Sequence, residues 1–440
     1  MADGVEKKQR LKVKETNKAY VRPRKKLGIR ECRLVTFDLP YLAFYYNQKL
    51  MIYRGDEYEK MAVKLKESLS LVLEEFYPLA GKLAKDDDGV FKVEYDDGMD
   101  GVEVAEAVAA AGDDGETMSV DDLIAMEDMS FSSSLVPFNG VLNLEGLHRP
   151  LLGVQLTKLR DGVVIGCGFN HAVLDGTSTW HFMSSWAKIC SGATTTVSVP
   201  PLHDRTKVRN TRVKLNLALP SHAPSKGDHH PSNGSTANGT PEPPPLREKI
   251  SDGSKPFSTF QSLSVHIWRA VTTARQLNPE DHTVFTIFAD CRKRVDPPMP
   301  ESYFGNLIHA IFTVTAAGLL LANPPEFGAG MIQKTIEAHD AKAIERRNED
   351  WEGNPIIFQY KDAGVNCVAV GSSPRFKVYD ADFGWGAPRS VRSGSNNKFD
   401  GMVYLYPGKS GGRSIDVEIS LEGKAMEYLE KDKEFLMEEP

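Results

Sequence analysis

Residues 163–176 read VVIGCGFNHAVLDG, and the pattern of the chain changes within them. The first seven form an apolar run that follows the turn signal Arg160-Asp161-Gly162. Such a run predicts a buried strand that returns beside an upstream strand at Val154–Leu159. From Thr177 onward, apolar side chains recur at helical spacing. A strand-to-helix switch is therefore expected across 170–176, a place where loops often display functional side chains.

Helices and strands are mixed on both sides of this switch. Upstream, 57–76 predicts a helix, because its apolar residues fall on one stripe. Downstream, the patterns predict further elements, namely helices at 260–275 and 331–344, a final helix that carries Met426, Leu429 and Leu436, and strands at 284–289, 402–406 and 414–421. This mixture in both halves predicts an α/β protein.

The middle of the chain differs in composition. Residues 219–256 are crowded with Pro, Ser, Gly, Asn and His, and they predict a linker. We therefore expect an N-terminal half at 1–200, a crossover with this linker at 201–256, and a C-terminal half at 257–440. The linker histidines at 222, 229 and 230 are interpreted as plain linker rather than as metal ligands.

Composition and charge exclude several classes of protein. The chain has 440 residues, of which 41% are hydrophobic and 26% are charged, as in a globular protein of two or three domains. A net charge of -7 argues against nucleic acid as the main partner. The most apolar stretch, 307–322, contains His309 and two threonines, so a buried strand plus a turn is expected there rather than a membrane span.

The N-terminal segment and the cysteines indicate in which cellular compartment the protein is expected. The basic residues of 1–31 predict a solvated arm that leads into a first strand, and we expect no secretory signal. Five cysteines are scattered along the chain, and no two form a CxxC pair. This spacing supports neither a disulfide framework nor a zinc cluster, so we expect no metal, reduced thiols and a cytoplasmic protein.

His171 lies in the expected switch, with Asp175 four residues later. An imidazole with a pKa near 6.5 can accept a proton at physiological pH. Asp175 falls where the helix begins, so it can cap the helix or pair with a cation and fix the turn. Taken alone, such an HxxxD pattern is more often a core histidine beside a capping aspartate. The chain lacks the GxSxG, GxxxxGK[ST], HExxH and complete GxGxxG signatures.

A second motif, Asp382-Phe383-Gly384-Trp385-Gly386, follows near the C-terminus. HxxxD and DFGWG in this order and separation resemble the plant BAHD acyltransferases, which move an acyl group from a coenzyme A thioester to an alcohol or amine. The resemblance runs from about residue 13 to residue 436, and segments 77–81, 203–205, 290–294 and 303–306 agree with it. Segments 36–49 and 391–399 resemble the cuticle-associated subgroup called "defective in cuticular ridges".

The resemblance implies the two-domain chloramphenicol acetyltransferase-like fold of CoA-dependent acyltransferases, with a mixed sheet in each half and a channel between the halves. His171 and Asp175 would form the catalytic motif, with His171 as the general base and Asp175 as a structural residue paired with an arginine. DFGWG would be a structural motif that lies away from the histidine and shapes the second domain. In it, Asp382 would pair with an arginine of 290–294, and the two glycines would permit a tight turn around Trp385.

The same resemblance implies the substrates. Acyl-CoA would be a co-substrate and no cofactor would be bound permanently. The acceptor would be a small alcohol or hydroxy-lipid, such as a hydroxy fatty acid or glycerolipid hydroxyl in cutin formation, and the enzyme would act as a monomer. Because a thioester is already activated, no acyl-enzyme is needed, and Cys167 is expected to be a buried structural thiol.

Several alternatives stay open. Ser393 to Lys398 replace the glycine- and proline-rich run common after DFGWG in hydroxycinnamoyl transferases, which weighs against shikimate or quinate as the acceptor. A hydroxycinnamoyl-CoA transferase acting on a phenolic or an aliphatic alcohol remains an alternative. So does a peptide-synthetase condensation domain, although Asn170 replaces the first histidine of its HHxxxDG motif. A non-catalytic binding protein and a lyase on the same scaffold are the remaining alternatives.

Overall fold

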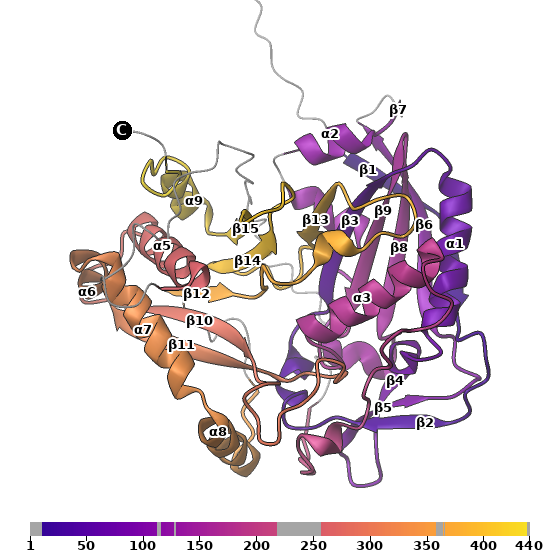
Figure 1. Ribbon diagram of the computed structural model, residues 1–440, viewed down its shortest axis with the longest axis horizontal. Helices are drawn as coiled ribbons and strands as arrows, with labels where there is room; N and C mark the ends of the chain where they lie inside the picture. The colour runs from indigo at the N-terminus through magenta and orange to yellow at the C-terminus, as the bar shows by residue number, and fades with distance from the viewer. Residues whose placement is uncertain are drawn as a thin grey trace, which may run out of the picture.

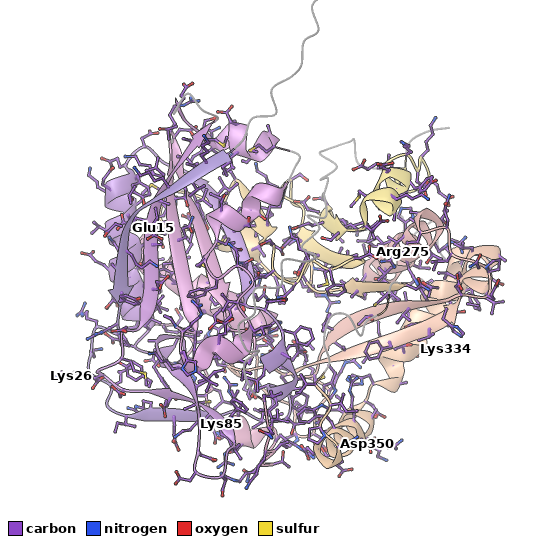
Figure 2. All side chains as sticks on the ribbon, turned by 180° about the vertical axis from the view of Figure 1, so that it is seen from behind. Glu15, Lys26, Lys85, Arg275, Lys334 and Asp350 are labelled. Carbon is purple, nitrogen blue, oxygen red and sulfur yellow. The ribbon has the colours of Figure 1, made fainter. Side chains whose placement is uncertain are left out.

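The computed structural model describes residues 11–111, 116–126, 129–217, 257–357, 364 and 366–437. The expected linker at 219–256 lies outside the described residues. The described strands form two large mixed sheets and one small sheet. The large sheets lie side by side, each with helices packed on it (Figure 1). Seen from behind in Figure 2, Lys26 and Lys85 mark the N-terminal half, and Arg275 and Lys334 mark the C-terminal half.

The N-terminal sheet and its helices come mainly from the first half of the chain. In chain order they are β1 (Leu11–Val21), β3 (Asn47–Arg54), α1 (Tyr58–Val72), β6 (Val102–Ala111), β7 (Glu116–Thr117), α2 (Val120–Ala125), β8 (Leu152–Leu159), β9 (Gly162–Phe169), α3 (Gly176–Ser191) and β13 (Ser390–Ser393). The strand order is β1-β6-β8-β9-β3-β13, with β7 beside β6. Only β6 and β8 run parallel among these pairs. Apolar residues of α1 and α3 bury one face of the sheet.

The C-terminal half has a five-stranded sheet. Its elements are α5 (Thr259–Ala274), β10 (His282–Asp290), β11 (Ile308–Ala316), α6 (Ala317–Ala322), α7 (Pro325–Ala338), α8 (Ala341–Gly353), β12 (Cys367–Val370), β14 (Met402–Pro407), β15 (Ile415–Ser420) and α9 (Gly423–Leu429). The order β11-β10-β12-β14-β15 mixes parallel and antiparallel pairs. A mixed sheet in each half confirms the expected α/β architecture.

Two smaller features complete the fold. A three-stranded sheet, β2-β5-β4, lies beside the N-terminal half and consists of β2 (Arg30–Arg33), β4 (Lys82–Lys85) and β5 (Phe91–Tyr95). The strand β13 comes from the second half of the sequence but pairs antiparallel with β3, with Ser393 opposite Lys49. The two halves are therefore joined by a shared sheet as well as by the chain, and the boundaries at 200 and 256 stay a prediction.

Some predicted elements differ from the structure. The single helix expected at 331–344 is wrong, because the side chain of Asp340 accepts the amide proton of Ala343 and starts a second helix, α8. The apolar stretch 307–322 is a strand followed by the short helix α6 rather than by a turn. Within the basic N-terminal segment, 11–21 is itself a strand, β1. The final helix, α9, ends at Leu429, so Leu436 is not part of it.

Candidate active site

The loop that carries His171 begins where β9 ends and finishes where α3 begins. Asn170 is fully buried, donates to the carbonyl of Asn143 at 2.7 Å and accepts from the amide of Ala172 at 3.1 Å. The backbone of His171 is held by two other asparagines. The Asn143 side-chain oxygen accepts its N–H at 2.8 Å, and Asn306 of the C-terminal half donates to its carbonyl at 2.8 Å. The position of His171 is therefore fixed from both halves.

Asp175 is fully buried and joins α3 to the C-terminal half. Its Oδ1 accepts the amide proton of Ser178 at 2.9 Å and so caps α3. Its two oxygens also bind Arg292 at 2.8 and 3.0 Å, and Oδ2 accepts from the amide of Leu307 at 3.0 Å. Burial by itself raises the pKa of Asp175, but Arg292 and these hydrogen bonds hold the pKa below its ordinary value. Asp175 is thus an ionised anchor of the loop.

His171 is partly exposed as a residue, and its ring stacks on Tyr41, with 4.7 Å between ring centroids and 14° between planes. Its Nδ1 is buried. Burial lowers the pKa of His171, and the nearby charge of Asp175 only partly opposes this. The imidazole is therefore neutral at pH 7 and able to accept a proton.

A cavity of about 730 Å³ opens between the two halves. The N-terminal half contributes residues within 36–44, and the C-terminal half contributes residues of β10, β11, β12 and α8, including Asp350, which Figure 2 labels. Most lining side chains are apolar, among them Phe288, Phe312 and Val314. His171 is not itself a lining residue, but Tyr41 lines the cavity and also stacks on its imidazole, so one aromatic ring connects the cavity to His171.

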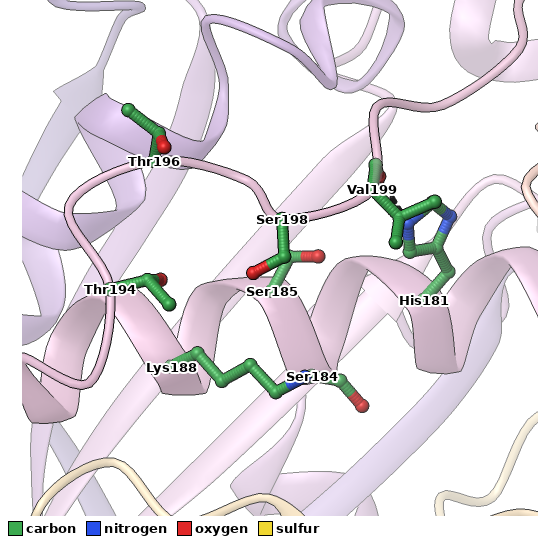
Figure 3. Close-up of a pocket in the computed structure, with 8 residues that line it drawn as sticks. All are labelled: His181, Ser184, Ser185, Lys188, Thr194, Thr196, Ser198 and Val199. Atoms are coloured by element: carbon green, nitrogen blue, oxygen red, sulfur yellow. Dashed lines mark hydrogen bonds between the residues drawn. The ribbon is translucent and has the colours of Figure 1, made fainter.

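A second pocket, of about 70 Å³, lies between α3 and residues 194–199 (Figure 3). In Figure 3, His181 lies beside Val199, whose carbonyl is 2.8 Å from its Nε2. This volume has room for only a few water molecules. We therefore assign neither substrate to it.

The DFGWG motif forms a tight turn. Asp382 Oδ1 accepts from the amides of Gly384 and Gly386 at 2.7 and 2.9 Å, and both glycines have left-handed backbones, with φ of 108° and 92°. The prediction that Asp382 pairs with an arginine of 290–294 is wrong, because Arg292 of that segment binds Asp175. The Asp382 carboxylate instead supplies the acceptor that the turn's own amides need.

The motif docks on the N-terminal half rather than on the second domain, which corrects that expectation. Phe383 is fully buried, with its ring 5.0 Å from Trp186 of α3 and 5.7 Å from Tyr53 of β3. Trp385 lies against the same Tyr53 at 6.3 Å, and the Tyr53 hydroxyl donates to the carbonyl of Ala381 at 2.7 Å. The motif thus holds the chain that leads into β13 against the helix that follows His171.

Three potential metal ligands meet beside the cavity, which the sequence analysis did not anticipate. The ligand atoms of Cys291, His309 and His339 lie within 4.8 Å of one another. Burial, and then the positive charge of Arg347, lowers the pKa of His309 to about 3 and that of His339 to about 4. Because a neighbouring guanidinium repels a cation as well as a proton, we interpret the cluster as neutral, with only His309 lining the cavity.

Sequence reasoning assigned no role to several residues that hold this site. Asp38 and Arg205 form a fully buried ion pair at 2.8 Å. Arg205 also donates to the carbonyl of Val173 at 2.7 Å, and Asp38 accepts from the amide of Asn306 at 2.9 Å. Segments 36–49, 203–205 and 303–306 carried the family resemblance, which was a usable signal for these residues. Asn143 had no such signal.

Comparisons with known proteins agree with this geometry. The model described as "Transferase family" matches residues 11–436. "BAHD acyltransferase DCR" of Arabidopsis thaliana is 58% identical, over 98% of this chain and 93% of its own length. "Hydroxycinnamoyltransferase 2" of Oryza sativa subsp. japonica is 30% identical, over 90% of this chain and 91% of its own. The solved structure of vinorine synthase has a TM-score of 0.72 at 19% identity, covers 97% of this chain and 98% of its own, and shows likeness in fold.

These matches extend far beyond the two motifs. The 58% identity confirms the predicted subgroup, and the likeness to vinorine synthase supports the predicted fold. The fold, the HxxxD loop and the DFGWG turn occur together in one chain that matches the family over nearly its whole length. This chain therefore belongs to the BAHD acyltransferases of the Transferase family and is an acyl-CoA-dependent acyltransferase.

Proposed function

We propose that this enzyme transfers an acyl group from acyl-CoA to the hydroxyl group of an aliphatic acceptor, with His171 as the general base. The observation that carries the proposal is a neutral imidazole stacked on Tyr41, which lines a mostly apolar cavity of about 730 Å³ between the two halves. A cavity of this size falls in the usual range for small-molecule sites.

The chemistry needs one base and two substrates in contact. With Nδ1 buried, Nε2 of His171 takes the proton of the acceptor hydroxyl as that oxygen attacks the thioester carbonyl. The C–S bond then breaks, and the imidazolium returns the proton to the CoA sulfur. No acyl-enzyme is involved, since Cys167 is fully buried and burial raises the pKa of its thiol. Positioned base catalysis typically contributes about 10²–10⁴-fold.

The apolar lining favours long aliphatic chains. Phe312, Val314 and Ile356 line the cavity and remain 49%, 48% and 66% exposed, so they offer apolar surface to a ligand. This fits a hydroxy fatty acid or glycerolipid acceptor in cutin formation, the chemistry expected of the cuticle-associated subgroup. A hydroxycinnamoyl donor is the second candidate, because the rings of Phe37, Tyr41, Phe288 and Phe399 in the same lining would stack on an aromatic acyl group.

Other readings of the fold have less support. A condensation domain needs a second histidine, whereas Asn170 is fully buried and its side chain is engaged by the carbonyl of Asn143 and the amide of Ala172. We propose a cytoplasmic monomer, in keeping with five cysteines that are all buried and free. No helix among the described residues is long and apolar enough to cross a membrane.

The direct test is detection of free CoA thiol with purified enzyme. The donors are long-chain, hydroxycinnamoyl and acetyl CoA thioesters, and the acceptors are hydroxy fatty acids, glycerolipids and phenolic alcohols. We expect acceptor-dependent thiol release, fastest with a long-chain donor and an aliphatic hydroxyl. Release that never exceeds the rate without acceptor, for any pair, would contradict the proposed function.

A further inference from the structure

Tyr41 lies on the short 3-10 helix η1 (Leu39–Ala43) and lines the cavity of about 730 Å³. Its ring stacks on the imidazole of His171 at 4.7 Å and contacts the ring of Phe44 at 5.6 Å. Asn143 ties the two backbones together, because its side chain donates to the carbonyl of Tyr41 and accepts from the amide of His171, both at 2.8 Å. The phenol therefore has a fixed position beside the base.

The Tyr41 hydroxyl has no hydrogen-bond partner among the described residues. Only 6% of Tyr41 is exposed, yet its hydroxyl oxygen is not one of the buried polar atoms that lack a partner. The oxygen is therefore reachable from the cavity that Tyr41 lines. Burial raises the pKa of Tyr41, and Arg347 opposes this only in part. The phenol thus keeps its proton at pH 7 and is able to donate a hydrogen bond.

Other hydrogen-bond donors around His171 are already engaged. The amides of His171 and Ala172 donate to asparagine side chains at 2.8 and 3.1 Å. The side chain of Asn306 donates to the carbonyl of His171 and to a buried carboxylate. The hydroxyl of Thr36, which also lines the cavity, binds the carboxylate of Glu352, a group that can only accept. Among these described groups, the Tyr41 hydroxyl is the donor that remains free.

We propose that the Tyr41 hydroxyl donates a hydrogen bond to the carbonyl oxygen of the acyl-CoA thioester and stabilises the negative charge that develops there. The inference rests on the proposed role of His171, because both side chains must act on the same thioester. As the acceptor oxygen bonds to the carbonyl carbon, the π electrons of the C=O bond move onto the carbonyl oxygen, and the acceptor's proton moves to His171.

Tyr41 keeps its own proton throughout this step. The electrons return to the carbon as the C–S bond breaks, so the tyrosine needs no regeneration. Arg347 lines the same cavity, and its positive charge makes the phenol a stronger donor. A donor that is fixed in place before the reaction is the arrangement that stabilises such an oxyanion most effectively.

The first test reads the carbonyl group without turnover. An acyl-CoA with a ¹³C-labelled carbonyl is bound without acceptor, and infrared difference spectra give its C=O stretching frequency, which a hydrogen bond lowers. We expect a lower frequency in the wild type than in Tyr41→Phe, which keeps the ring and loses only the hydroxyl. The control Tyr379→Phe should match the wild type, since that hydroxyl donates to Asp416 at 3.3 Å and Tyr379 does not line the cavity. Equal frequencies in the wild type and Tyr41→Phe would overturn the inference, even for an enzyme that releases no thiol.

The second test compares the acyl-CoA thioester with a dithioester, in which sulfur replaces the carbonyl oxygen and accepts hydrogen bonds weakly. We expect Tyr41→Phe to lower kcat for the thioester about 10²–10³-fold, with unchanged melting, and to lower kcat for the dithioester much less. Equal losses for both substrates, or a normal kcat with the thioester, would overturn the inference. Transfer at the wild-type rate by His171→Ala would instead overturn the proposed base.

Discussion

At the scale of single residues, the histidine depends on charged groups that never touch its ring. Asp175 caps α3 and binds Arg292, and both side chains are almost wholly buried. Removing one partner of a buried ion pair is costly, because the other charge is left in a medium that solvates it poorly. The loop of His171 is therefore stabilised by an ion pair that spans the two halves.

Asp175→Asn should lower the free energy of unfolding by about 3–5 kcal/mol, because it leaves Arg292 buried without a counter-charge. Urea unfolding of the variant and the wild type measures this. Asp340→Asn is the matched control, since Asp340 also caps a helix but is exposed, and asparagine caps about as well as aspartate. Equal, small effects of the two substitutions would contradict the assignment.

The sequence indicated His171 and Asp175 because they fall at a change of hydrophobic period. The family resemblance correctly gave Asp175 an arginine partner, which the structure identifies as Arg292. An arginine of 290–294 was expected to bind Asp382, and nothing in a single chain shows which carboxylate a distant arginine meets. Asn143 and Asn306 were not assigned for the same reason, since each meets His171 only through a hydrogen bond to its backbone.

At the scale of elements, the DFGWG turn secures α3. Gly384 adopts a φ of 108°, and a Cβ at this position would lie 3.1 Å from Cα of Ser191, at the end of that helix. A side chain is therefore disfavoured both by the backbone conformation and by the close approach. The motif therefore packs against the C-terminal end of α3, whereas Asp175 caps the N-terminal end of the same helix.

Gly384→Ala should destabilise the protein by about 1–3 kcal/mol, whereas Gly330→Ala on α7 should be neutral or slightly stabilising. Gly330 has an ordinary backbone, and a Cβ there would meet no atom within 4 Å. Thermal melting measures the first effect, and turnover per folded molecule should change little. Normal melting with selectively lost turnover would indicate that the turn takes part in the reaction.

The hydrophobic periodicity predicted helices and strands correctly where it continues over many residues. The strands around 154–169 and the helix that follows are where the periodicity placed them. The break between α7 and α8 was not predicted, because the apolar spacing runs across it and only the cap at Asp340 divides it. The insertion of β13 into the other half's sheet was not predicted either, since a four-residue strand leaves no sign of its partner.

At the scale of the whole molecule, buried neutral histidines couple stability to pH. The folded-state pKa values of His309 and His339 are lowered to about 3 and about 4, whereas both lie near 6.5 in an unfolded chain. Between these values the unfolded chain binds more protons than the folded one. The free energy of unfolding therefore falls as the pH falls below about 6.5.

Urea unfolding at pH 5.5 and 7.5 should give a stability lower at pH 5.5 by about 1 kcal/mol for each of these two histidines. His339→Gln should reduce the difference by about 1 kcal/mol, because an amide does not take up the proton. Equal stability at both pH values, or greater stability at pH 5.5, would contradict the assignment of buried neutral imidazoles.

The two halves and their mixed sheets were predictable from alternating elements and the composition of the linker. The cavity was not, because it forms only where 36–44 meets three strands and a helix from the other end of the chain. Its apolar lining is therefore information that the structure adds, and it bears directly on the substrate.

The central claim is that the imidazole of His171 accepts the acceptor's proton. The most direct measurement is the rate of CoA thiol release by His171→Ala with the best donor and acceptor, beside the wild type and the control His181→Ala on α3. We expect a loss of about 10²–10⁴-fold for His171→Ala, with unchanged melting, and little loss for His181→Ala. A folded His171→Ala enzyme that transfers acyl groups at the wild-type rate would contradict the account.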